Sequence, residues 1–135
     1  DLINEGCGIL GRILSINGLS RGEKHGWWSL GNSVLFDLKM DSFKSKHPKE
    51  LVFDLAPYLP GGISNQKLKI IYNGNLVGQY TIESETQIRI PLEKVTKSVS
   101  INFLIDTPIR PMDYDRNSQD NREIALLFKR VGLYY

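Results

Sequence analysis

Two carboxylates stand close together in the segment MDYDR, at Asp113 and Asp115. Residues two apart on a β-strand point to the same face, so on a strand these side chains could form the carboxylate pair of a glycosidase. The carboxylates of such enzymes normally come from separate elements that flank a cleft. We therefore expect a solvated loop in which an Asp pairs with a neighbouring Arg, and a small glycan-processing enzyme is the weaker alternative.

Other catalytic or metal-binding patterns are absent from the sequence. His25 and His47 lack the spacing of metal ligands, and the chain has no G-x-S-x-G nucleophile elbow. The glycines of GILG and YNGNLVG do not open onto a helix with a lysine, as a phosphate-binding loop does. A Ser-His-Asp site assembled from distant segments stays open as an alternative. We expect a non-catalytic chain that holds no metal and no cofactor.

Two adjacent tryptophans, Trp27 and Trp28, lie in the segment EKHGWWSLGNS. Neighbouring residues of an extended chain point to opposite sides, so at most one of these rings can join the core. The other ring could stack on a sugar, or it could close one end of the core with its indole N–H bonded to a carbonyl. Further aromatic candidates for such a surface are Tyr58, Tyr72, Tyr80 and Tyr114.

Composition limits the classes of partner. The chain has 135 residues, 41% of them hydrophobic and 24% charged, with a net charge of +2. Lys and Arg are scattered and balanced by acids, which argues against a nucleic-acid groove. The one cysteine, Cys7, cannot form an internal disulfide, and no apolar run reaches the roughly 18 residues of a membrane span. We expect a single domain over residues 1–135, excised from a larger protein.

Alternation with a period of two is the dominant pattern along the chain, and it predicts half-buried strands. In SVLFDLKM, the apolar residues occupy every second position. An Asn73-Gly74 pair between two β-rich runs predicts a two-residue type I′ hairpin, since both central residues of that turn need positive φ. The other expected strands are ELVFDLA, TQIRIPL, SVSINFLID and the last segment, REIALLFKRVGLYY, whose composition would also suit a helix.

These short strands, with no credible crossover helix between them, predict an all-β fold. We expect an antiparallel β-sandwich or jelly roll of seven to eight strands. The longest connections are residues 17–32, 42–49 and 107–121. Loops of this length in a compact domain usually carry function or move.

A family resemblance covers the chain from about Gly11 to Leu133. The segment GLSRGEKHGWWSLG resembles the pattern G-W-S-x-P-E-x-W-G-x-W-S-x-G of a β-sandwich domain attached to bacterial membrane-bound transferases that build or decorate cell-surface glycans. The matching positions are Gly18, Ser20, Glu23, Gly26, Trp28, Ser29 and Gly31. The NG hairpin and IRIPL resemble two further family motifs, and DNREIALLFKRVGL is similar to the family's ending at Asp120, Arg122, Ile124, Phe128, Val131 and Leu133.

The sequence also departs from the family pattern. Leu19 and His25 replace two of its three tryptophans, Gly22 replaces its proline and Ala125 replaces a glycine. The resemblance therefore supports the fold more firmly than a sugar site, and Trp27 is the residue that could compensate.

The polar matches have two readings. Glu23, Ser29, Asp120 and Arg122 could form a half-buried network that ties the N-terminal loop to the last strand, because an Arg fork pairs well with carboxylates. The same groups could instead grip sugar hydroxyls or a phosphate. The candidate carbohydrate-binding residues are Glu23, Trp27, Trp28, Ser29, Asp120 and Arg122.

The resemblance implies a non-catalytic, extracytoplasmic accessory domain. Such a domain would bind or position a glycan or lipid-linked oligosaccharide for the membrane-embedded domain of a glycosyltransferase or phosphoglycerol transferase. The alternative from another class is an interaction module that packs on the parent enzyme and binds no sugar.

Overall fold

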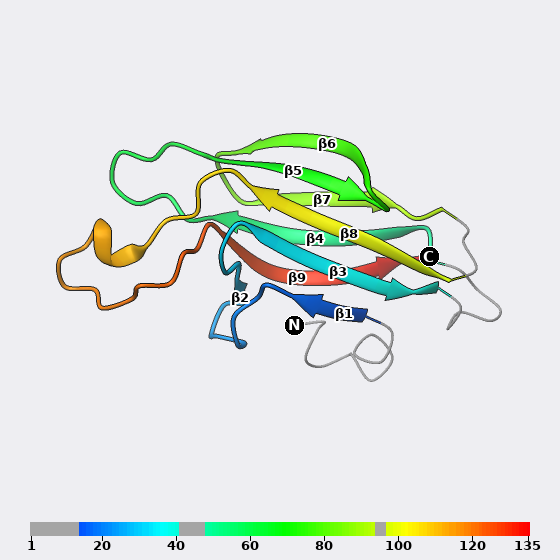
Figure 1. Ribbon diagram of the computed structural model, residues 1–135, viewed down its shortest axis with the longest axis horizontal. Coiled ribbons are helices and arrows are strands. Elements are labelled where there is room, and N and C mark those ends of the chain that lie inside the picture. The colour runs from blue at the N-terminus through cyan, green and yellow to red at the C-terminus, as the bar shows by residue number, and fades with distance from the viewer. Residues whose placement is uncertain (1–13, 41–47, 94–96) are drawn as a thin grey trace.

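Two antiparallel sheets pack face to face in the computed structural model, which describes residues 14–40, 48–93 and 97–135 (Figure 1). The first sheet has the strand order β1 (Leu14–Asn17), β3 (Ser33–Lys39), β8 (Ser98–Ile105), β5 (Gln66–Tyr72) and β6 (Asn75–Ile82). The second has the order β2 (Trp27–Trp28), β9 (Leu126–Tyr134), β4 (Glu50–Pro57) and β7 (Thr86–Pro91). The predicted all-β sandwich is confirmed.

The number of strands is nine among the described residues, rather than seven to eight. The short strands β1 and β2 lie in the N-terminal part of the chain, where the sequence shows no sustained alternation. Both form because a longer neighbour offers an edge, β3 to β1 and β9 to β2. Cys7, His47 and most of the 42–49 connection lie outside the described residues.

Four phenylalanines form the centre of the core. Phe36 and Phe103 come from the first sheet, and Phe53 and Phe128 come from the second. Their ring centroids lie between 4.8 and 6.2 Å apart, mostly in edge-to-face pairs. Such pairs add about 0.5–1.5 kcal/mol each to the burial of the rings. The alternation predicted from the sequence thus places these four side chains between the sheets.

The β5–β6 hairpin turns at Asn73-Gly74, as predicted. Both residues have positive φ, 47° and 85°, which is the requirement of a type I′ turn. Asn73 also accepts a hydrogen bond at its Oδ1 atom from the Ser100 N–H (2.7 Å). This bond fixes the hairpin to the neighbouring strand β8.

The last segment is a strand and not a helix. β9 pairs with β4 along its whole length, with an irregularity between Asp54 and Leu55 where Lys129 is the extra residue. Three connections gather at the end of the sandwich where β9 begins, namely residues 18–32, 58–65 and 106–125 (Figure 1). We call this region the loop end. The connection 106–125 contains the 3₁₀ helix η2 (Pro111–Asp113).

Candidate functional site

The two tryptophans face opposite sides of the second sheet, as their adjacency predicts. Trp27 pairs with Phe128 and is only 5% exposed, whereas Trp28 pairs with Leu127 and is half-buried. Gly26, just before β2, has φ 142°, and a Cβ atom there would collide with the carbonyl oxygen of Phe128. A glycine is therefore needed for β2 to approach β9. Trp28 is the ring that reaches the surface.

Tyr58 lies against the Trp28 ring. The two ring centroids are 5.8 Å apart and the ring planes meet at 80°, an edge-on arrangement. Tyr58 directly follows β4, and its backbone N–H donates to the Ala125 carbonyl (2.8 Å). This bond holds the tyrosine beside the start of β9. We call Trp28 and Tyr58 the aromatic pair.

Arg122 gathers the predicted carboxylates. Its Nε and Nη2 atoms donate to the two carboxylate oxygens of Asp120 (2.9 and 2.7 Å), and its Nη1 atom donates to Glu23 Oε2 (3.0 Å). The hydrogen bond from Arg122 is the main reason why the pKa of Asp120 lies below its ordinary value. The bonds to Asp120 and Glu23 in turn raise the pKa of Arg122. The network ties the N-terminal loop to the chain just before β9, in agreement with the structural reading, which placed the link at the start of the last strand.

Ser20 connects this network to the tryptophan. Its hydroxyl proton has two acceptors within reach, the Arg21 carbonyl (2.9 Å) and Glu23 Oε2 (3.1 Å), and its Oγ atom accepts from the Trp28 N–H (3.0 Å). Ser20 matches the family pattern but was not among the predicted site residues. The sequence carries no sign that this hydroxyl links a carboxylate to the tryptophan backbone.

Two carboxylates lie near the tyrosine of the aromatic pair. The pKa of Tyr58 is raised, first by burial and then by the nearby carboxylates of Asp115 and Asp120. At neutral pH the phenol carries its proton, as an ordinary tyrosine does, and can donate a hydrogen bond. The aromatic pair and the Arg122 network thus adjoin one another at the loop end.

Ser29 and Trp27 do not join this surface. Ser29 is fully buried, and its Oγ atom accepts from the backbone N–H groups of Ala125 (3.1 Å) and Leu126 (3.0 Å). These bonds occupy the hydroxyl and fix the entry to β9. Of the six predicted residues, the structure places four at one surface: Glu23, Trp28, Asp120 and Arg122.

Asp113 and Asp115 lie in the exposed connection 106–125, as expected, and not on a strand; Asp113 is the last residue of η2. Asp113 lies 3.6 Å from the guanidinium of Arg110, and Asp115 accepts from the backbone N–H of Asn117 through its Oδ1 atom (2.9 Å). Each carboxylate thus has a local partner within the loop. The arrangement is that of a turn stabilised by its own side chains.

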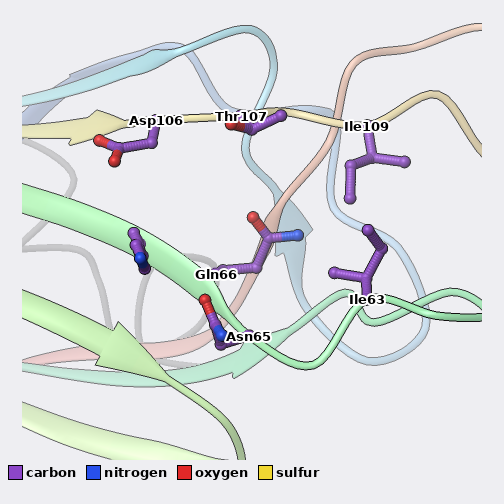
Figure 2. A pocket seen from close by; sticks show the side chains of 7 residues that line it. Ile63, Asn65, Gln66, Asp106, Thr107 and Ile109 are labelled. Atoms are coloured by element: carbon purple, nitrogen blue, oxygen red, sulfur yellow. The ribbon is translucent and has the colours of Figure 1, made fainter.

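A pocket of about 370 Å³ opens at the loop end (Figure 2). Its lining residues come from the start of β5 with the loop before it and from the chain just after β8: Ile63, Asn65, Gln66, Lys67, Asp106, Thr107 and Ile109. The sequence did not single out any of these residues, because they form no motif and come together only through the pairing of β5 with β8.

Neither a metal cluster nor a membrane span is found in the described part of the chain. It contains no group of three or more His, Cys, Asp or Glu side chains placed to hold a metal ion. Nor does any helix of residues 14–40, 48–93 and 97–135 have the length and apolar character to cross a membrane.

The fold is shared with proteins of known structure. No family model and no curated protein matches the chain. A family 35 carbohydrate-binding module from an environmental isolate has 13% identity and a TM-score of 0.50, with 87% of this chain and 84% of that chain covered.

Two esterases share the fold over part of their length. An acetyl xylan esterase from Butyrivibrio proteoclasticus has 14% identity and a TM-score of 0.57 over 90% of this chain. A family two carbohydrate esterase from Clostridium thermocellum, solved in complex with cellohexaose, has 8% identity and a TM-score of 0.53 over 90% of this chain. This chain spans only 29% and 33% of those two proteins. At such identities, the likeness shows the β-sandwich fold alone.

Proposed function

We propose that this chain is a non-catalytic glycan-binding module whose binding surface is centred on Trp28. The observation that carries the proposal is the half-buried Trp28 ring, placed edge-on to Tyr58 and linked through Ser20 to the Arg122 network. An indole face offers an apolar surface to the C–H face of a sugar, and nearby polar groups fix its hydroxyls. The shared fold supports the proposal, since the similar structures include a carbohydrate-binding module and two carbohydrate-active esterases.

The Arg122 network leaves hydrogen-bonding capacity for a ligand. A guanidinium has five N–H groups, and Arg122 uses three of them on Asp120 and Glu23. The side chains of Arg122 and Glu23 are 35% and 40% exposed, so solvent and ligands reach them. A sugar diol could therefore bind the remaining N–H groups and carboxylate lone pairs while the network stays intact.

The same network argues against catalysis at this surface. A general acid at neutral pH needs a raised carboxyl pKa, whereas Arg122 lowers the pKa of Asp120. Glu23 shares the same guanidinium. The Asp120 carboxylate is thus better suited to accept hydrogen bonds from hydroxyls than to deliver a proton.

The family resemblance supplies the cellular part of the proposal. In this proposal, the module lies on the extracytoplasmic side of a bacterial membrane and positions a glycan or lipid-linked oligosaccharide of the cell envelope. The parent enzyme is a membrane-bound glycosyltransferase or phosphoglycerol transferase. The resemblance in the segments around Trp28 and Arg122 carries this part.

Tryptophan fluorescence and calorimetry test the binding proposal. The wild type, Trp28→Ala and Trp27→Phe are titrated with a panel of bacterial surface oligosaccharides. We expect a saturable response in the wild type and Trp27→Phe, and a loss of about tenfold or more in affinity for Trp28→Ala, as for a central aromatic contact. Tyr134→Ala is a matched control, since it removes an exposed aromatic side chain from the opposite end of the sandwich. Equal affinities for Trp28→Ala and Tyr134→Ala would overturn the proposal.

One observation favours the interaction module as a second candidate. Leu76 and Val77, on the edge strand β6, are 52% and 54% exposed. Apolar side chains on an open sheet edge suit pairing with another protein. If no saccharide perturbs Trp28 while a Leu76→Lys, Val77→Lys double variant loses its association with the parent enzyme, this second candidate is the better account.

A further inference from the structure

The pocket at the loop end has two chemically different sides. Figure 2 shows Ile63 and Ile109 facing one another on one side, and the polar side chains of Asn65, Gln66 and Thr107 on the other. Its volume of about 370 Å³ lies within the range of small-ligand sites. A ligand that fits must therefore present an apolar group and a polar group side by side.

Gln66 gives the pocket a directed acceptor. This side chain is only 2% exposed, and its Nε2 atom donates to the backbone carbonyl of Tyr58 (2.7 Å). Because only the NH₂ group can pair with a carbonyl, this bond fixes which way the amide points. The Oε1 atom faces the Thr107 side of the pocket, and no side chain or backbone group within the described residues donates to it.

This acceptor has no donor among the described residues, so it is available to an N–H or O–H group of a ligand. The groups beside it can serve the other end of an amide. Thr107 carries a hydroxyl donor, and Asn65 uses its Nδ2 atom for one bond to Ser64 Oγ (3.1 Å), which leaves a second amide proton. The two isoleucines offer a slot for a methyl group. Together, these groups complement an N–H, a C=O and a methyl.

We infer that this pocket binds the acetamido group of an N-acetylated sugar. The inference rests on the proposed glycan-binding function and names its substrate class. The acetamido N–H donates to Gln66 Oε1, its carbonyl accepts from Asn65 or Thr107, and its methyl lies between Ile63 and Ile109. Hydroxyls of the same sugar reach Lys67 and Asp106.

The charges of the pocket favour a neutral ligand. Lys67 and Asp106 are both exposed and carry opposite charges, so the lining has no net charge. A phosphate, sulfate or uronate would meet the Asp106 carboxylate without a surplus of cations. An acetamido sugar carries no such charge, and therefore fits the pocket better.

Tyr58 connects the pocket to the aromatic pair. Its ring lies against Trp28, and its carbonyl accepts the bond that orients Gln66. The chain at Tyr58 thus borders both surfaces. The two surfaces can still be tested apart, because they share no side chain that contacts the ligand.

A pair of tetrasaccharides isolates the acetamido group. β-1,4-linked tetramers of N-acetylglucosamine and of glucose differ only in the substituent at C2, an acetamido group or a hydroxyl. We expect the wild type to bind the N-acetylated tetramer about tenfold or more tightly than the glucose tetramer. A difference of this size in affinity is typical of one small apolar group together with its hydrogen-bond partners. Ile63→Ser should reduce this preference to about twofold or less, and Asn65→Ala should reduce it partly. Leu76→Ser is the matched control, since it replaces an exposed aliphatic side chain far from the pocket and should keep the preference.

NMR chemical shifts of the backbone amides and of the Trp28 indole N–H distinguish binding in the pocket from binding at Trp28. If the N-acetylated tetramer shifts Ile63 and Thr107 but leaves the Trp28 indole unchanged, the pocket binds sugar and the Trp28 proposal fails. If both tetramers bind equally and depend on Trp28, the acetamido inference is overturned while the glycan-binding proposal stands. If neither tetramer shifts any of these signals, the acetamido inference is overturned, and the titration with bacterial surface oligosaccharides decides the Trp28 proposal separately. An unchanged preference in Ile63→Ser would also refute the pocket's role.

Discussion

Trp28 lies edge-on against Tyr58, although 30 positions in the sequence separate them, because β9 pairs with both β2 and β4. The edge contact holds the half-buried indole at a fixed angle on the outer face of the second sheet. A ring held in this way loses little further freedom when a ligand binds, which favours affinity.

The first prediction concerns this contact. Tyr58→Ala removes an edge-to-face partner worth about 0.5–1.5 kcal/mol and exposes more of the Trp28 ring. We expect a red shift of tryptophan fluorescence and a weaker affinity for any glycan that binds the wild type. Tyr58→Phe keeps the ring and should behave like the wild type in fluorescence. A spectrum of Tyr58→Ala identical to that of Tyr58→Phe would show that the pair does not hold Trp28.

The second prediction concerns the buried hydroxyl of Ser29. Ser29→Ala leaves the N–H groups of Ala125 and Leu126 without their acceptor in the protein interior. We expect a loss of about 2 kcal/mol or more in the free energy of unfolding, since each unsatisfied buried group is costly. Urea denaturation measures this loss. Ser64→Ala, at an exposed loop position, is the control. Equal urea midpoints for the two variants would contradict a stabilising role of the Ser29 hydrogen bonds at the start of β9.

The third prediction concerns the glycine before β2. Gly26→Ala places a methyl group against the Phe128 carbonyl at a positive φ, so β2 must move away from β9. We expect destabilisation of about 3 kcal/mol or more. Gly61→Ala, where the added methyl meets open space, should leave the melting temperature nearly unchanged. If Gly26→Ala and Gly61→Ala had the same melting temperature, β2 would not be held against β9 as the structure describes.

The fourth prediction concerns pH. The pKa of Asp120 is lower in the folded state than its ordinary value of 3.8, chiefly because Arg122 donates to it. This ion pair therefore contributes stability above pH 3.8, and the contribution disappears as the pH falls through the folded pKa. Between about pH 5 and pH 2, the wild type should lose more stability than Asp120→Asn, which has no such proton to gain. If the free energies of unfolding of the two proteins, measured by urea denaturation, changed in parallel with pH, the result would contradict a stabilising Arg122–Asp120 ion pair.

Local patterns in the sequence were enough to predict much of the fold. The alternation in SVLFDLKM places Val34, Phe36 and Leu38 in the core, and Asn73-Gly74 forms the expected hairpin. Both are short-range effects, because the side-chain period of a strand and the φ requirement of a turn act over a few residues. The short strands β1 and β2 were missed, since they depend on an edge supplied by another part of the chain.

The candidate site, like the fold, was partly predictable from local sequence and partly set by long-range strand pairing. The sequence by itself determined that Trp27 and Trp28 point to opposite sides, and the family resemblance selected Glu23, Asp120 and Arg122. Only the tertiary structure decided that Trp28 is the outward ring, because the pairing of Trp27 with the core residue Phe128 fixes the register of β2. The pocket around Gln66 also arises only where the start of β5 meets the end of β8. The reason is physical: a one-residue change of register turns every side chain to the other face, and long-range pairing alone sets that register.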